Sequence, residues 1–169
     1  LLPSYVLPKL GPDYLKGLDS YDVIVRSPGV HPREIVAANG PEILPKVTSC
    51  IIEFFAKCPA PIIGVTGTKG KGTTSTLIYL MLKAANKTAF IGGNIGTVPL
   101  DFLHEVTPDS FVVLELSNFQ LIDFTGRANT AVCLMLVPEH LDWHANKEDY
   151  YAAKANLFAH QTADDRLVY

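Results

Sequence analysis

The chain alternates short apolar runs with longer segments in which apolar residues recur at helical spacing. The apolar runs predict strands at residues 21–25, 61–65, 88–91, 111–116 and 130–136, and residues 166–169 have the pattern of one more strand beginning. The helical spacing predicts helices at residues 32–39, 73–86 and 147–160, with another from an N-cap at Thr48 to near Pro59. Because strands and helices alternate, we expect an α/β fold, a parallel sheet with covering helices.

The pattern also indicates how the chain is divided. The helix at residues 73–86 has an apolar face of the kind that packs on a core, formed by Leu77, Leu80, Met81 and Ala84. A proline-bearing join predicts a domain boundary, with residues 1–46 ending one domain and residues 47–169 opening the next. Because the chain does not begin with Met and ends on a strand pattern, we expect a piece of a larger protein.

Composition excludes several classes of function. The chain has 169 residues and a net charge of −3, so it lacks the basic surplus that favours nucleic-acid binding. Its apolar runs are much shorter than the roughly 20 residues of a membrane-spanning helix, and we expect no membrane insertion. Three cysteines without a C-x-x-C pair indicate buried free thiols in a reducing, cytoplasmic setting.

The sharpest motif is GVTGTKGKGTT at residues 64–74, between a predicted buried strand and a predicted helix. Glycines let backbone N–H groups line a concavity, and a helix N-terminus adds partial positive charge, so this turn suits phosphate groups. We expect Lys71 to reach the terminal phosphates of a nucleoside triphosphate. The candidate cofactor-binding residues are Gly67, Thr68, Lys69, Gly70, Lys71, Gly72, Thr73 and Thr74.

Two observations leave alternatives to this interpretation. A strict P-loop, G-x-x-x-x-G-K-[ST], has a hydroxyl directly after the lysine, whereas this chain has Gly72 there and hydroxyls at Thr73 and Thr74. A glycine-rich turn between a strand and a helix can also bind nothing. Four glycines and two lysines in one turn make a site for a mononucleotide triphosphate the better hypothesis.

Five further motifs resemble those of the Mur ligase family, the ATP-dependent amide-forming enzymes of cell-wall assembly. They are SPGV at residues 27–30, GGNIG at 92–96, ELSNFQL at 115–121, PEHLDWH at 138–144 and YAAKANLF at 151–158. All occur in family order, and ELSNFQL is most similar to the signature of the D-glutamate-adding branch. Three residues depart from the family pattern: Gly72, Asn118 in place of a serine, and Met135 in place of an asparagine.

The resemblance implies an ATP- and Mg²⁺-dependent ligase that adds D-glutamate to UDP-N-acetylmuramoyl-L-alanine through an acyl phosphate, in peptidoglycan precursor synthesis. It covers the end of the family's nucleotide-sugar domain and the first part of its central ATPase domain. We therefore expect a P-loop sheet domain preceded by the tail of a Rossmann-like, UDP-sugar-binding domain. We expect no complete ligase activity from residues 1–169 alone.

The resemblance also implies roles for individual residues. The implied catalytic residues are Lys71, Glu115, His140 and Lys154, and the implied metal ligands are Thr73, Glu115, His140 and Lys154, the lysine being carbamylated by CO₂. The implied substrate contacts are Ser27, Pro28, Gly29, Asn94, Ser117 and His140. Glu115 also ends a predicted parallel strand, where sheets of this type place their ligands.

Each residue taken alone has a plainer interpretation. Glu115 can be a buried acid with a backbone or lysine partner, His140 a hydrogen-bonded loop histidine, and Lys154 a solvated helix lysine. For the whole chain, the alternatives are a folylpolyglutamate synthetase-like ligase, a P-loop nucleotide-binding module without ligase activity, and an inert structural remnant. The ELSNFQL stretch favours a Mur ligase, because folate enzymes lack it.

Overall fold

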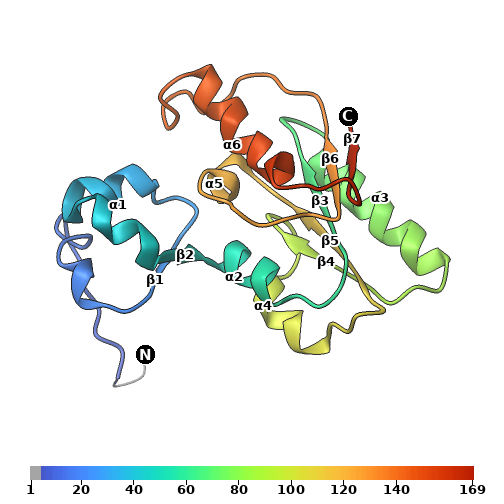
Figure 1. Cartoon of the computed structure of the whole chain (residues 1–169), viewed down its shortest axis with the longest axis horizontal. Helices are drawn as coiled ribbons and strands as arrows, with labels where there is room; N and C mark the ends of the chain where they lie inside the picture. The colour runs from blue at the N-terminus through green and yellow to red at the C-terminus, as the bar shows by residue number, and fades with distance from the viewer. Residues whose placement is uncertain (1–4) are drawn as a thin grey trace.

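A five-stranded parallel sheet forms the larger part of the protein in the computed structural model, which describes residues 5–169 (Figure 1). The strand order is β4-β5-β3-β6-β7, and all neighbouring strands run parallel. The strands are β3 (Ile62–Thr66), β4 (Ala89–Gly93), β5 (Phe111–Glu115), β6 (Thr130–Cys133) and β7 (Arg166–Val168). The predicted α/β fold with a parallel sheet is confirmed.

Helices cover the two faces of this sheet unequally (Figure 1). Among the described residues, α2, α4, α5 and α6 supply the core on one face, and α3 alone packs on the other. The bounds are α2 (Cys50–Lys57), α3 (Lys71–Ala84), α4 (Pro99–Phe102), the 3₁₀ turn η3 (Leu103–Glu105), α5 (Asn118–Leu121) and α6 (Lys147–Ala159).

Side chains of the central strands alternate between these faces, as the two-residue period of a strand requires. On β5, Val112 and Leu114 join the larger core cluster, whereas Val113 joins the smaller cluster under α3. All three are fully buried, which explains the continuous apolar run in the sequence. Gly64 lets α6 pack directly on β3, because a Cβ at residue 64 would lie 2.7 Å from the Leu157 Cδ1 atom.

A smaller N-terminal lobe lies beside the sheet lobe (Figure 1). It contains a two-stranded parallel sheet, and its β2 strand leads directly into α2. Its elements are η1 (Leu18–Ser20), β1 (Ile24–Arg26), α1 (Pro32–Asn39), η2 (Pro41–Lys46) and β2 (Val47–Ser49). Since β2 pairs with β1, the N-terminal lobe extends three residues past the boundary predicted at residue 46, and the division into domains stays a prediction.

The predicted elements all exist, with ends shifted by at most three residues, and α1 agrees at both ends. The helix predicted from a Thr48 N-cap starts one residue later, because Ser49 is the cap and accepts from the Ile52 N–H at 3.3 Å. The apolar pattern does not predict β2, α4 or α5, since three or four residues are too few to show a period.

The apolar face predicted for α3 does not pack on the core. Leu77, Leu80 and Met81 are 54%, 53% and 69% exposed. The sheet is instead contacted by Ile78, Tyr79 and Leu82, and Ser75 is buried on the same side. The prediction was wrong because α3 has apolar residues on both sides, so periodicity alone does not identify the buried one.

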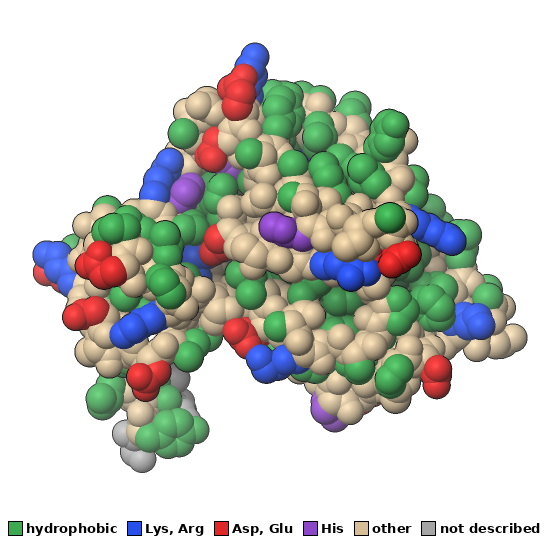
Figure 2. Space-filling model, viewed as in Figure 1, with side chains coloured by type: hydrophobic (Ala, Val, Ile, Leu, Met, Phe, Trp, Pro, Cys, Tyr) green, Lys and Arg blue, Asp and Glu red, His purple; other side chains and the backbone are tan. Residues whose placement is uncertain are grey.

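The helices, the surface charges and the cysteines bear on the expectations drawn from composition. No helix in residues 5–169 combines the length and the apolar character needed to cross a bilayer. Acidic and basic side chains are interspersed on the face that Figure 2 shows. Cys50, Cys58 and Cys133 are free thiols, but the prediction that they are buried was wrong, because Cys50 is exposed and the other two are half-buried.

Replacing Leu157 with Ala should cost about 2–5 kcal/mol of unfolding free energy, because this fully buried side chain packs on Gly64 and the core. Leu77→Ala is the matched control, with an expected cost below about 1 kcal/mol because the side chain is exposed. Urea unfolding of the chain measures both. Equal losses would mean that α3 packs with its other face inward.

Candidate active site

The candidate site lies where the carboxyl ends of β3, β5 and β6 meet. β3 lies between the other two strands, and the chain leaves β3 into α3 on one face of the sheet and β5 into α5 on the other. This divergence is where open α/β sheets form a ligand crevice. Because Val65 of β3 is in register with Glu115 of β5, the glycine-rich loop begins level with the Glu115 carboxylate.

Two glycines of this loop have backbone conformations that other residues rarely adopt. Gly67 has a φ of +142° and Gly70 a φ of +85°. A Cβ at residue 67 would also lie 2.7 Å from the Leu134 Cβ atom. Glycine at these positions therefore allows the loop to lie against the chain that follows β6.

The loop ends at a helix N-terminus whose amides are free. Gly70 is the N-cap of α3 and provides no side-chain cap. Within residues 5–169, the N–H groups of Lys71, Gly72 and Thr73 have no acceptor, whereas the Thr74 N–H donates to the Gly70 carbonyl at 2.9 Å. Three free donors at the positive end of a helix dipole form a site suited to an anion.

Two lysines donate to carbonyl groups of this loop. The Lys71 Nζ atom donates to the Thr68 carbonyl at 3.0 Å, and the Lys154 Nζ atom to the Gly67 carbonyl at 2.9 Å. Lys154 is 1% exposed, so its interpretation as a solvated helix lysine is wrong. Burial, and then the nearby charge of Lys71, lower the pKa of Lys154 to about 8. A desolvated amine with an unusually large neutral fraction therefore lies under the loop.

The other candidate residues of the loop differ in whether their polar side chains are already bound within the protein. Thr68 is buried, and its hydroxyl donates to the Val137 carbonyl at 2.8 Å and lies 2.8 Å from the Tyr150 hydroxyl. Its N–H donates to the Met135 carbonyl, so Thr68 anchors the loop to the segment after β6. Lys69 and Thr73 are exposed, and their side chains are free to meet a ligand.

Glu115 and Asn94 form one hydrogen-bonded unit at the ends of β5 and β4. Glu115 is 4% exposed, and its Oε1 atom accepts from the Asn94 Nδ2 atom at 2.9 Å. The Asn94 N–H also donates to the Glu115 carbonyl at 2.8 Å. Gly93 permits this approach, because its φ is +101° and a Cβ there would lie 2.2 Å from the Glu115 carbonyl oxygen. One side-chain and one backbone hydrogen bond therefore join the GGNIG motif to the ELSNFQL motif.

The other carboxylate oxygen of Glu115 faces the start of α3. A Cβ at Gly72 would lie 3.1 Å from the Glu115 Oε2 atom, and the exposed Thr73 hydroxyl follows in the same turn. An open carboxylate oxygen beside free amides fits Mg²⁺, which uses one or two protein oxygens and completes its shell with phosphate and water. Among residues 5–169, no three His, Cys, Asp or Glu side chains converge to hold a metal by themselves.

His140 lies on the loop between β6 and α6. It is exposed, has a φ of +56°, and packs its ring 4.8 Å from that of Phe119 on α5. Its neighbour Glu139 is close enough for its charge to oppose the lowering of the Lys154 pKa. The described side chains form no hydrogen bond from His140 to Glu115 or Lys154, so their joint role as metal ligands stays a prediction.

A buried polar chain that the sequence reasoning missed positions the His140 loop. The Asn118 Nδ2 atom lies 2.8 Å from the His144 Nε2 atom, and the His144 Nδ1 atom 3.0 Å from the Asp149 Oδ2 atom. Asn118 and His144 are each 3% exposed. Asn118, a departure from the family pattern, thus has a partner far away in the sequence. Ser117, a predicted substrate contact, is buried as the N-cap of α5 in a capping box with Gln120.

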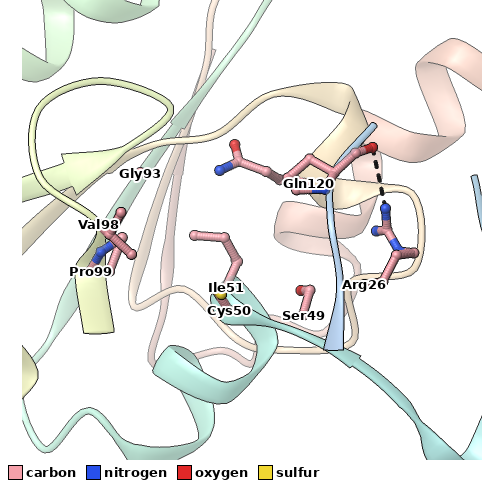
Figure 3. A pocket seen from close by; sticks show the side chains of 9 residues that line it. Arg26, Ser49, Cys50, Ile51, Gly93, Val98, Pro99 and Gln120 are labelled. Carbon is pink, nitrogen blue, oxygen red and sulfur yellow. Dashed lines mark hydrogen bonds between the residues drawn. The ribbon is translucent and has the colours of Figure 1, made fainter. Parts of the chain in front are cut away.

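The SPG turn of the N-terminal lobe borders the same region. The Trp143 Nε1 atom donates to the Gly29 carbonyl at 3.5 Å, and the Arg33 Nη2 atom to the Trp143 carbonyl at 2.7 Å. A cavity of about 220 Å³ between the turn and the sheet edge is lined by Arg26, Pro28, Gly93 and Gln120, among others (Figure 3). The sequence gives no signal for Arg26, because an arginine at a strand end usually reaches solvent.

Comparison with known proteins identifies the class of protein to which this fold and site belong. A model of the Mur ligase middle domain matches residues 65–169, more than half of the chain. The chain therefore belongs to the Mur ligase family, and the resemblance noted from its motifs is confirmed.

Individual relatives match almost the whole of this chain, beyond the part that the family model matches. UDP-N-acetylmuramoylalanine--D-glutamate ligase of Acetivibrio thermocellus is 46% identical over 161 residues, which cover 94% of this chain and 34% of that protein. The ligase of the same name from Clostridium kluyveri is 42% identical over 159 residues, which cover 94% of this chain and 35% of that protein. The chain thus spans about a third of the length of these curated relatives.

One solved structure supports the fold independently of the sequence motifs. A structure of E. coli FolC in complex with DHPP and ADP matches with a TM-score of 0.50 and 19% identity, covering 89% of this chain and 43% of that one. At this identity the similarity shows a shared fold alone.

Gly93→Ala should lower the unfolding free energy by about 3 kcal/mol or more, because it adds a clash with the Glu115 carbonyl to the cost of a positive φ. Gly96→Ala is the matched control, since Gly96 also has a positive φ (+68°) but the nearest atom to its Cβ is 3.6 Å away. Its expected cost is about 1–2 kcal/mol. Urea unfolding of both variants compares them, and equal costs would contradict the close approach of β4 and β5.

Proposed function

We propose that this chain is part of an ATP-dependent ligase that adds D-glutamate to UDP-N-acetylmuramoyl-L-alanine through an acyl phosphate, in cytoplasmic peptidoglycan precursor synthesis. The observation that carries the proposal is the arrangement at the sheet edge, where free amides of α3, the Lys71 amine and an open Glu115 oxygen lie together. The identity to ligases that carry this activity in their name supports the choice of substrates.

Forming an amide from a carboxylate requires a better leaving group than oxide, and phosphorylation of the carboxylate by ATP provides one. The work of the protein is then to align the reactants and to neutralise charge. We assign the P-loop role to residues 67–74, with the amides of Lys71, Gly72 and Thr73 on the phosphates. Lys71 exchanges its bond to the Thr68 carbonyl for the terminal phosphates and stabilises the charge that develops there.

The Glu115 carboxylate and the Thr73 hydroxyl would hold Mg²⁺ beside this loop. The ion would neutralise phosphate charge there. Asn94 donates to one Glu115 oxygen and so keeps the other turned toward α3. We assign His140, whose ring packs on Phe119, to the nucleotide-sugar substrate, with Ser27, Pro28, Gly29 and Asn94 as further contacts.

Lys154 is the residue whose surroundings best suit a chemical modification. Carbamylation by CO₂ requires a neutral amine, and burial with Lys71 nearby lowers the pKa of Lys154 to about 8. The product is an anionic oxygen ligand close to the phosphate loop. We propose that this carbamate and His140 hold a second metal.

We assign each of the two lobes to one of the two domains that the sequence predicts. We assign residues 1–46 to the end of a Rossmann-like UDP-sugar-binding domain with its linker, and residues 47–169 to the first part of the central ATP-binding domain. The crevice between them contains the SPG turn on one side and the GGNIG and ELSNFQL motifs on the other.

The alternatives differ from this proposal in substrate dependence. In the gene product that contains these residues, ADP release should require both UDP-N-acetylmuramoyl-L-alanine and D-glutamate. Turnover with tetrahydrofolate in their place would establish the folylpolyglutamate synthetase-like alternative. ADP release in the absence of both of these substrates and of tetrahydrofolate would point to a nucleotide-hydrolysing module.

Lys71→Ala in that gene product should reduce turnover by roughly two orders of magnitude or more, because it removes a positioned positive charge from the developing phosphate charge. Lys83→Ala is the control, since Lys83 is exposed in the last turn of the same helix. Isothermal titration with Mg-ATP and a coupled ADP assay measure binding and turnover. Wild-type turnover in Lys71→Ala would refute the assignment of the loop.

Lys154→Ala should lose activity, and small carboxylic acids should restore part of it by replacing the carbamate oxygen. Lys147→Ala, at the exposed first position of the same helix, should neither lose activity nor respond to the acids. The measurement is the initial rate against carboxylic acid concentration, with circular dichroism as a check of folding. A folded Lys154→Ala variant that no acid activates would count against carbamylation.

A further inference from the structure

Arg26 lies buried beneath the SPG turn, although the turn itself is exposed. Its side chain is 0% exposed and forms an ion pair with Asp123, whose side chain is 23% exposed. The Arg26 Nε and Nη2 atoms donate to the two Asp123 carboxylate oxygens at 2.9 Å and 2.5 Å. Asp123 follows α5, so this pair connects the N-terminal lobe to the segment that begins at Glu115.

The rest of the guanidinium is bound by carbonyl groups. The Nη1 atom donates to the carbonyls of Ser27, Pro28 and Val30 at 3.2, 3.3 and 3.0 Å. The Nη2 atom also donates to the Phe119 carbonyl at 3.2 Å. Figure 3 shows Arg26 among the residues that line the cavity, and its dashed line is the hydrogen bond from Arg26 to the Pro28 carbonyl. All donor nitrogens of Arg26 are therefore used, three of the acceptors being carbonyls of one turn.

The conformation of this turn is not the one that its sequence favours. The Val30 N–H donates to the Ser27 carbonyl at 3.0 Å, which closes a β-turn with Pro28 and Gly29 at its centre. Pro-Gly at these positions favours a type II turn, in which the glycine has a positive φ near +80°. Gly29 is not among the glycines with positive φ. The central peptide is therefore turned the other way, with the Pro28 carbonyl on Arg26.

The orientation of that peptide determines where its donor points. In a trans peptide the N–H points opposite to the C=O, so the Gly29 N–H points away from Arg26. It has no acceptor within residues 5–169, and Gly29 is exposed. A flip of the Pro28–Gly29 peptide to the type II form would direct this N–H inward and present a carbonyl oxygen instead, which repels an anion.

We infer that Arg26 is a positioning residue for the nucleotide-sugar substrate: it selects the peptide orientation that presents the Gly29 N–H to a phosphate group. This inference rests on the proposed function, in which the SPG turn contacts that substrate. Arg26 does not touch the substrate itself. It acts through the turn, and Asp123 and the Phe119 carbonyl hold it in place from the sheet lobe.

Arginine is the side chain suited to this task. Its planar fork binds the Asp123 carboxylate with two donors while the third nitrogen reaches the turn, a geometry that the single ammonium of lysine does not provide. A buried ion pair alone is weak evidence for a stabilising role, because desolvation offsets the attraction. The three turn carbonyls on one nitrogen favour a role in conformation.

The test uses the gene product that contains these residues, with Arg26→Met, Arg26→Lys and Asp123→Asn. In Arg26→Met, the KM for UDP-N-acetylmuramoyl-L-alanine should rise roughly 10–100-fold, the range expected when a charge-assisted hydrogen bond is lost. The KM for ATP should stay within about twofold, because the phosphate loop is untouched. Arg26→Lys and Asp123→Asn should show smaller rises in the same KM. A crystal structure of Arg26→Met should show Gly29 with a positive φ.

Arg127→Met is the matched control, because Arg127 also binds a carboxylate through two nitrogens, on Asp165, but is partly exposed and lies near the amino-terminal ends of β3 and β6, away from the candidate site. It should leave both KM values unchanged. Equal rises of both KM values, an unflipped turn in Arg26→Met, or a lower melting temperature with no change in KM would each refute the inference. If Arg26→Met does not fold, an unchanged substrate KM in Asp123→Asn refutes it. A wild-type enzyme that does not use the nucleotide sugar refutes the proposed function instead.

Discussion

The parallel register of β5 with its two neighbours, β3 and β4, is the constraint on which the rest of the site depends. Val65 pairs with Glu115, and Glu115 pairs with Gly93, so three motifs begin at one level of the sheet. Only glycine fits at residue 93, because the Glu115 carbonyl occupies the space of a Cβ. Once these strands have paired, their carboxyl ends place the free amides of α3 beside the Glu115 carboxylate and Asn94.

Buried side chains of α6 connect this helix to the glycine-rich loop, and Lys154 is the central one. Its amine lies on the Gly67 carbonyl and 4.7 Å from the centre of the Tyr150 ring, while the Tyr150 hydroxyl reaches Thr68. Two residues of α6 therefore hold the glycine-rich loop in place. Burial disfavours the charged form of this amine, and ionisable groups perturbed in this way are frequent at functional sites.

Much of the fold could be predicted from the sequence, because buried parallel strands and α1 show clear patterns and caps. The short elements β2, α4 and α5 could not, and the inward face of α3 could not be identified when both of its sides are apolar. At the site, the glycine-rich loop and Glu115 were predicted from local motifs. Arg26 with Asp123 and Asn118 with His144 were not, because each pair is distant in sequence and forms only when the lobes and loops pack.

The central claim is that the backbone N–H groups at the start of α3 bind a triphosphate beside Glu115. The most direct measurement is a crystal structure of the gene product with Mg²⁺ and a non-hydrolysable ATP analogue. The account predicts phosphate oxygens on the N–H groups of Lys71, Gly72 and Thr73, with Mg²⁺ on the Glu115 Oε2 atom. An analogue bound elsewhere, with Lys71 still on the Thr68 carbonyl, would contradict it.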